Sequence, residues 1–127
     1  MSQYRNPMQR ARGLGSAKSG TGHFWWQRVT AIALIPLVAL FIGLLASLIG
    51  TDLESVRATI ARPWNAILLA LFVIALFWHS KLGLQVVIED YVHTRAVEVT
   101  LQLLVTLACA VGAFASLYAI GRIALMA

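Results

Sequence analysis

The chain has 127 residues, of which 60% are apolar and 12% are charged, and its mean hydropathy is +0.80. Soluble domains carry about 25% charged residues, so this composition excludes a soluble globular domain and indicates an integral membrane protein. The formal net charge is +5, but half of the basic residues precede the first long apolar run. Such a distribution is typical of a membrane topology signal and argues against a nucleic-acid-binding surface.

The first 28 residues form a basic segment without any acidic residue. Its middle, GLGSAKSGTG, predicts a flexible arm, and the HFWWQR that follows predicts a membrane-interface segment, with Trp25 and Trp26 at the level of the lipid headgroups. A cleaved mitochondrial transit peptide is the alternative, because such peptides are also rich in arginine and poor in acidic residues. We expect an arm and interfacial segment over residues 1–28, followed by a membrane domain over residues 29–127.

Three apolar runs predict transmembrane helices over residues 29–49, 64–87 and 99–120, since about 20 apolar residues span the hydrocarbon of a bilayer. Small residues recur every fourth position in the first and third runs, a pattern that lets helices approach closely in lipid. These residues are Ala39, Gly43 and Ser47 in the first run and Ala108, Gly112 and Ser116 in the third. The predicted fold class is therefore all-α, an integral membrane bundle whose three helices pack against a second membrane protein.

The connecting segments predict how the chain is oriented. Residues 50–63 carry two acidic and two basic side chains and predict a short loop with at most a turn or two of amphipathic helix. The basic arm belongs on the opposite side of the membrane from this loop, which makes the N-terminus cytoplasmic, or on the matrix side in an organelle. A dense polar turn over residues 89–98 then lies on the same side as the arm.

His79 is an intramembrane histidine and therefore a candidate functional residue. Ala75 and Gly83 lie four residues before and after it, on the same helical face, so the imidazole has almost no side chain above or below it. One interpretation is a hydrogen bond to a hydroxyl or carbonyl of another helix. The other is an axial haem ligand, because a flat macrocycle needs small residues one turn either side of its ligand. The spacing leaves both open.

Two further groups are candidates at the inner ends of the helices. Asp90 and Tyr91 are either solvated residues of the polar turn or parts of a quinone site, in which a phenol hydrogen-bonds a quinone carbonyl beside a proton-exchanging carboxylate. Arg28 is either a positive-inside anchor or a guanidinium paired with a carboxylate such as a haem propionate. His23 has no neighbour at metal-ligand spacing and is interpreted as an interfacial residue.

The run from His79 to His93, HSKLGLQVVIEDYVH, resembles the H-x-x-x-G-x-Q…D-Y-V-H/K signature of the hydrophobic membrane anchor of succinate dehydrogenase, respiratory complex II. The segment HFWWQRVTA, from His23 to Ala31, is similar to the H-x-(W)-x-x-R-x-T-A segment of the same family. The resemblance covers nearly everything after residue 20.

What this resemblance implies is a complex of four proteins, in which a flavoprotein with FAD oxidises succinate, an iron–sulfur protein carries the electrons, and two membrane anchors hold haem b. It implies that His79 is one haem axial ligand, that Gly83 packs against the haem, and that Tyr91 and Asp90 bind ubiquinone. Arg28 is expected near the haem propionates or the quinone. Nucleic acid is not an expected partner.

Several alternatives remain at the level of sequence. A small non-redox membrane scaffold or regulatory protein of a larger complex is the runner-up, and the anchor of a fumarate reductase is a related one. An ion carrier is disfavoured because intramembrane charges do not repeat along any helix. The expected location is the bacterial inner membrane, with the mitochondrial inner membrane as the alternative.

Overall fold

The structure, a computed structural model, describes the backbone of residues 16–126 and the side chains of residues 21–126. Within that range it contains helices and no strand, which confirms the predicted all-α fold class. The helices are α2 (Ser16–Leu48), α3 (Leu53–Ala61), α4 (Pro63–Tyr91) and α5 (Arg95–Met126).

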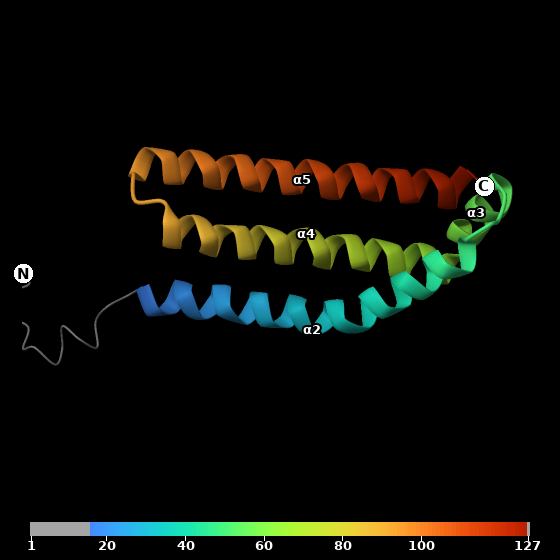
Figure 1. The fold of residues 1–127 in the computed structure, drawn as a ribbon, viewed down its shortest axis with the longest axis horizontal. Helices are drawn as coiled ribbons and strands as arrows, with labels where there is room; N and C mark the ends of the chain where they lie inside the picture. Colours follow the sequence, from blue (N-terminus) through green and yellow to red (C-terminus); the bar gives the residue numbers. More distant parts are fainter. Residues whose placement is uncertain (1–15, 127) are drawn as a thin grey trace, which may run out of the picture.

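Helix α4 is the centre of the bundle. It packs against α2 on one side and α5 on the other, and the three long helices lie in a single layer (Figure 1). Short α3 lies across one end of this layer, where it contacts α4 and α5. The start of α2 and the turn between α4 and α5 lie at the other end, so the predicted placement of the polar turn beside the N-terminal segment agrees with the fold.

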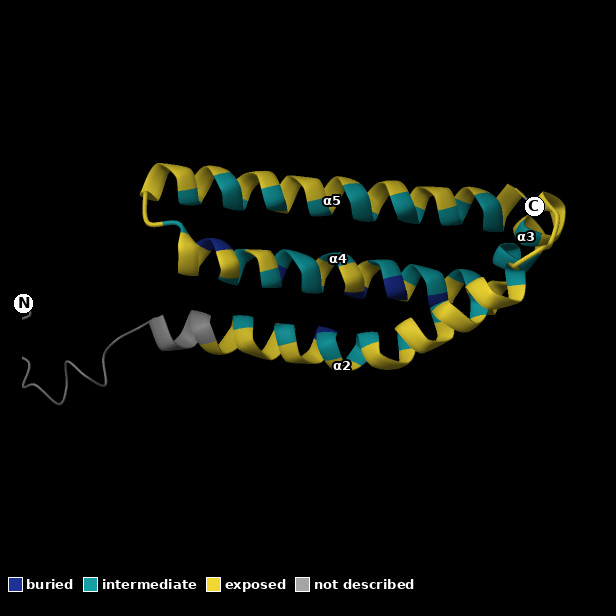
Figure 2. Cartoon of the chain, viewed as in Figure 1, coloured by how far each residue is buried: buried dark blue, intermediate teal, exposed yellow. Residues whose placement is uncertain are grey.

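The long helices have the length and composition of membrane spans. Three candidate spans, Thr21–Leu48, Pro63–Tyr91 and Arg95–Met126, have mean hydropathies of 2.7, 2.0 and 2.2 in their most apolar windows. Only 6%, 17% and 0% of those windows are buried within the chain, and most of the layer is exposed or half-buried (Figure 2). An apolar surface of this kind is stable only against lipid or other membrane proteins. The chain is thus an integral membrane protein.

The helices extend beyond the apolar runs that predicted them. Helix α2 begins at Ser16 rather than near residue 29, so part of the segment predicted to be a flexible arm is helical. The physical reason is tertiary packing, because the Trp26 and Trp78 rings stack with centroids 4.8 Å apart and join the start of α2 to α4. Helix α5 likewise continues to Met126, past the predicted residue 120. The arm residues 1–15 lie outside the described residues.

The predicted connecting segments are also more helical than expected. The polar turn is reduced to residues 92–94, since Glu89, Asp90 and Tyr91 still belong to α4. The outer loop contains α3, which Asp52 caps by accepting hydrogen bonds from the Ser55 amide at 3.4 Å and the Ser55 hydroxyl at 2.5 Å. The Ser55 hydroxyl lowers the pKa of Asp52 because its hydrogen bond favours the charged carboxylate.

Gly112, the middle residue of the small-residue stripe in the third apolar run, packs against Phe77 of α4 in the same chain. A Cβ atom at Gly112 would lie 2.6 Å from Cε1 and 2.8 Å from Cζ of Phe77, whereas Gly43 in the first stripe has open space in front of it. Glycine at position 112 therefore sets how closely α4 and α5 approach.

Replacing Gly112 with alanine is expected to destabilise the bundle, because overpacking forces the Phe77 ring to move at a cost of about 1–3 kcal/mol. The measurement is the thermal stability of the purified complex. Gly121→Ala is the matched control: it lies in the same helix, and its added methyl group meets nothing within 4 Å. Equal stability of the two variants would contradict the assigned packing role.

Candidate functional site

His79 lies within the membrane-spanning part of α4 and forms a polar contact with α2. At about 1.5 Å per residue it lies about 24 Å from Pro63 and about 18 Å from Tyr91 along the helix. Its Nδ1 atom lies 3.0 Å from Oγ1 of Thr30, within hydrogen-bonding distance. The sequence had left open whether this imidazole bonds to another helix or binds a cofactor. The structure provides the interhelical bond at Nδ1, while Nε2 makes no hydrogen bond within the described residues.

Thr30 is the most completely covered side chain of α2 among the described residues, with 6% of its surface exposed. Its hydroxyl also lies 2.7 Å from the carbonyl oxygen of Trp26 and 3.1 Å from that of Gln27. Two stacked aromatic pairs join α2 to α4, one before Thr30 and one after it along α2. They are Trp26 with Trp78 and Phe41 with Phe72. The imidazole is therefore held at the α2–α4 interface by a buried hydroxyl group.

The two small residues that flank His79 lie in different surroundings. Ala75 is buried inside the layer, whereas Gly83 is half-buried and a Cβ atom there would meet nothing within 4 Å. The space beside His79 is thus open toward Gly83 and closed toward Ala75.

Arg28 is exposed and lies near the start of the first span. Its guanidinium carbon lies 4.7 Å above the ring of Phe24, one helical turn earlier, in a cation–π contact. Within the described residues it forms no ion pair, so the carboxylate that the sequence predicts as its partner is not supplied by this part of the chain. Along α2, Arg28 lies less than one turn before Thr30.

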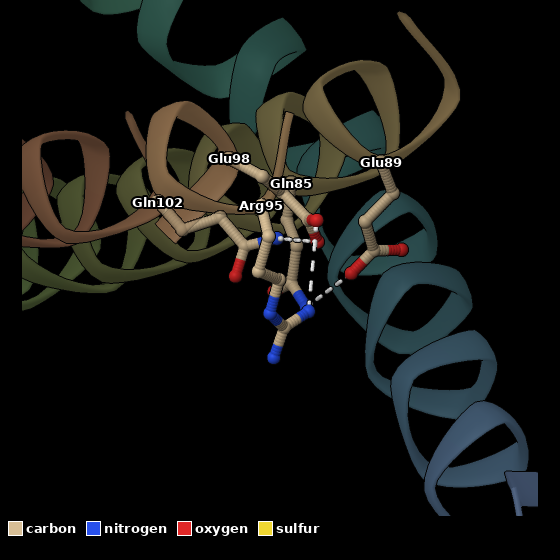
Figure 3. Close-up of polar contacts among 5 residues, drawn as sticks. All are labelled: Gln85, Glu89, Arg95, Glu98 and Gln102. Carbon is tan, nitrogen blue, oxygen red and sulfur yellow. Dashed lines mark hydrogen bonds and ion pairs between the residues drawn. The ribbon is translucent and has the colours of Figure 1, made fainter. Parts of the chain in front are cut away.

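Polar side chains gather where α4 ends and α5 begins (Figure 3). Gln85 donates a hydrogen bond to Glu89 at 3.0 Å within α4. In α5, Glu98 accepts a hydrogen bond from Gln102 at 3.3 Å and pairs with Arg95 at 3.6 Å. These bonds run within each helix, so they stabilise the helix ends without joining the two helices.

Asp90 and Tyr91 occupy the last turn of α4 and are exposed, Tyr91 with 79% of its surface. No hydrogen bond involves either side chain within the described residues. The phenol and the carboxylate are therefore free to interact with a ligand or a partner protein. They lie at the same end of the bundle as the start of α2, whereas His79 lies deeper in the span.

An open groove lies away from the residues described above. It has a volume of about 890 Å³ between α3 and the end of α5, and its lining is apolar apart from Glu54, Arg57, Tyr118 and Arg122. No residue predicted from the sequence as a site residue lines it. The described residues also contain no cluster of three histidine, cysteine or acidic side chains that could hold a metal ion. A porphyrin, by contrast, needs only one imidazole from this chain.

Sequence reasoning did not single out Thr30, although it lies within the quoted HFWWQRVTA segment. The available signal was the position of Thr30 in the first turns of one span, at the depth of His79 in another span. His23 was interpreted as interfacial, and the structure encloses its Nε2 atom without a hydrogen-bond partner within the described residues.

These features define a class of protein: an all-helical, three-span membrane protein with an imidazole in its central helix and free polar groups at one end. The sequence profile of the succinate dehydrogenase/fumarate reductase transmembrane subunits matches residues 2–117. The chain belongs to this family.

Individual relatives agree with the family assignment. A succinate dehydrogenase hydrophobic membrane anchor subunit of Paracoccus denitrificans is 42% identical over 89 residues, which cover 70% of this chain and 69% of the relative. A protein of the same name from Rickettsia bellii is 36% identical over 104 residues, covering 82% and 83%. The succinate dehydrogenase membrane anchor subunit of Reclinomonas americana is 37% identical over 90 residues, covering 66% and 75%. Such anchors are subunits of an enzyme complex and are not catalytic alone.

Proposed function

We propose that this chain is the anchor of a succinate:ubiquinone oxidoreductase and supplies it with one haem b axial ligand, His79, and part of the ubiquinone site, Tyr91 and Asp90. The observation that carries the haem assignment is the state of the His79 ring. Its Nδ1 is engaged by Thr30 at 3.0 Å, its Nε2 is free within the described residues, and the Gly83 position beside it is open. This is the arrangement that a nitrogen ligand to iron requires.

A bound haem b would supply one-electron redox chemistry within the membrane. What this chain contributes is one nitrogen at a fixed depth and an open helix surface at Gly83. Because α4 offers one imidazole at that depth, a second nitrogen ligand would have to be supplied by the other membrane anchor. Arg28 is exposed and forms no ion pair within the described residues, which supports a role for it in binding a haem propionate or lining the quinone pocket.

The end of α4 supports a quinone site on electrostatic grounds. Glu89 and Asp90 lie at the negative end of the helix dipole, and the last turn carries no basic residue. This placement is unfavourable for a carboxylate. Glu89 accepts a hydrogen bond from Gln85, whereas Asp90 forms no side-chain contact within the described residues that offsets the cost. A carboxylate kept there next to the exposed Tyr91 phenol fits a site that receives protons from water and passes them to a reduced quinone.

The positions of the ends of α2 and α4 also support one orientation of the chain in the membrane. If the iron–sulfur protein binds at the end where α2 begins and α4 ends, it brings its electrons to the side that carries Tyr91. We place that end on the cytoplasmic side of a bacterial inner membrane, in accord with the basic N-terminal segment. Succinate oxidation is favoured over fumarate reduction because the relatives are named succinate dehydrogenase subunits.

The test is purification of the intact complex through an affinity tag on this chain. We expect a flavoprotein, an iron–sulfur protein and a second membrane anchor to copurify, with one haem b for each copy of this chain by pyridine haemochrome assay. A complex of that composition without haem would contradict the haem assignment and leave the anchor function standing. Purification with unrelated membrane proteins would favour the scaffold alternative.

A further inference from the structure

The hydroxyl group of Thr30 has three polar neighbours but only one proton. Its oxygen lies 2.7 Å from the Trp26 carbonyl oxygen, 3.1 Å from the Gln27 carbonyl oxygen and 3.0 Å from Nδ1 of His79. A carbonyl oxygen only accepts hydrogen bonds, whereas a neutral imidazole nitrogen either donates or accepts. The three distances therefore restrict where the proton can be.

The Thr30 hydroxyl group donates its proton to a backbone carbonyl oxygen. If the hydroxyl donated to His79 instead, its lone pairs would face two carbonyl oxygens, one of them at 2.7 Å, with no proton between them. Donation to the Trp26 carbonyl avoids this repulsion and leaves a lone pair of Thr30 directed at the imidazole. Nδ1 of His79 must then carry the ring proton and donate it to Thr30, since two acceptors do not attract each other.

We propose that Thr30 is a positioning residue that fixes the tautomer and the ring orientation of His79, so that Nε2 keeps its lone pair for a ligand. The proposal rests on the proposed haem-ligand role of His79 and adds the residue that prepares it. A metal-bound histidine generally donates its second ring N–H to an acceptor, which orients the ring and raises the basicity of the ligating nitrogen. Here a backbone-anchored hydroxyl on the neighbouring helix is that acceptor.

The burial of Thr30 makes this bond hard to replace. With 6% of its surface exposed, the side chain has little access to water, and the site lies inside a membrane span. The ring N–H makes no other hydrogen bond within the described residues. Without the Thr30 acceptor the ring would turn, which changes the direction of Nε2, or it would adopt the other tautomer. In the other tautomer Nε2 carries the proton and cannot bind iron.

Two substitutions separate this role from simple packing. Thr30→Val keeps the branched shape and removes the hydroxyl, whereas Thr30→Ser keeps the hydroxyl and removes a methyl group. We expect Thr30→Val to weaken haem retention about 10- to 100-fold, the usual effect of removing such an outer partner, and Thr30→Ser to resemble the unaltered protein. The haem that Thr30→Val retains should have a more positive midpoint potential, because a less basic nitrogen ligand stabilises ferric iron less.

The measurements are haem content per flavin and a redox titration of the haem absorbance in the purified complex. Thr100→Val is the matched control, because Thr100 makes the same type of bond, to the Ala96 carbonyl at 2.7 Å, on an exposed part of α5. Unchanged haem content and potential in Thr30→Val would overturn the proposal. So would a loss of haem in Thr30→Ser equal to that in Thr30→Val, since it would make the role one of packing or assembly.

The His79 variant separates this inference from the proposed function. If replacing His79 removes the haem signal and Thr30→Val leaves it unchanged, the ligand assignment stands and the tautomer role of Thr30 is wrong. If the His79 variant keeps the signal, the ligand assignment itself is wrong, and the positioning role falls with it.

Discussion

Replacing Tyr91 with phenylalanine is expected to lower ubiquinone reduction about 10- to 100-fold, the equivalent of a charge-assisted hydrogen bond worth about 1.5–3 kcal/mol. The substitution removes only the hydroxyl and keeps the ring. Charge grows on the quinone carbonyl oxygen as it is reduced, so a phenol donor stabilises the reaction more than it stabilises ground-state binding. The effect should therefore appear mainly in the rate and less in the apparent affinity for ubiquinone.

The control for this prediction is succinate oxidation with an artificial acceptor that bypasses the membrane site. Its rate should be unchanged in Tyr91→Phe. Tyr118→Phe is the matched substitution, because Tyr118 is also exposed, at 69%, but lies beside α3 at the opposite end of the bundle. Equal losses in both assays would indicate damage to assembly. An unchanged ubiquinone rate would make Tyr91 an interfacial tyrosine without a role in the reaction.

The features that the sequence predicted well are those set by local composition. Three apolar runs were enough to define three spans, because a bilayer requires about 20 apolar residues in any helix that crosses it. The ends of the helices were less predictable. Helix α4 includes Glu89, Asp90 and Tyr91 because a helix does not have to stop where the hydrocarbon stops, and polar side chains are solvated beyond that level.

Contacts between helices could not be predicted from either helix alone. The small-residue stripe around Gly112 indicated close packing but not that Phe77 of the same chain fills the space. His79 was found from its spacing to Ala75 and Gly83, whereas Thr30 belongs to another helix, 49 positions away in sequence. The antiparallel arrangement of α2 and α4 brings the two side chains to the same depth.

Replacing His79 with alanine is expected to have the largest effect on the cofactor. The change removes the nitrogen ligand and leaves the helix with a favourable residue, so assembly should suffer less than haem binding. A haem with two imidazole ligands is low-spin and shows a sharp α-band when reduced. That band should be lost or strongly reduced in His79→Ala, and added imidazole should restore it in part by occupying the space that the side chain left.

The exposed His93 provides a matched control, because it lies in the turn after α4, outside the membrane span. His93→Ala should keep the full spectrum. Both variants should retain succinate oxidation with an artificial acceptor, which reports on the partner proteins.

The most direct measurement is therefore the dithionite-reduced minus oxidised difference spectrum of the purified complex, recorded for the unaltered protein, His79→Ala and His93→Ala at equal flavin content. We predict a sharp α-band in the unaltered protein and in His93→Ala, and its loss in His79→Ala with partial return on adding imidazole. An unchanged α-band in His79→Ala would show that the haem iron takes its ligands from elsewhere and would contradict the central role assigned to this residue.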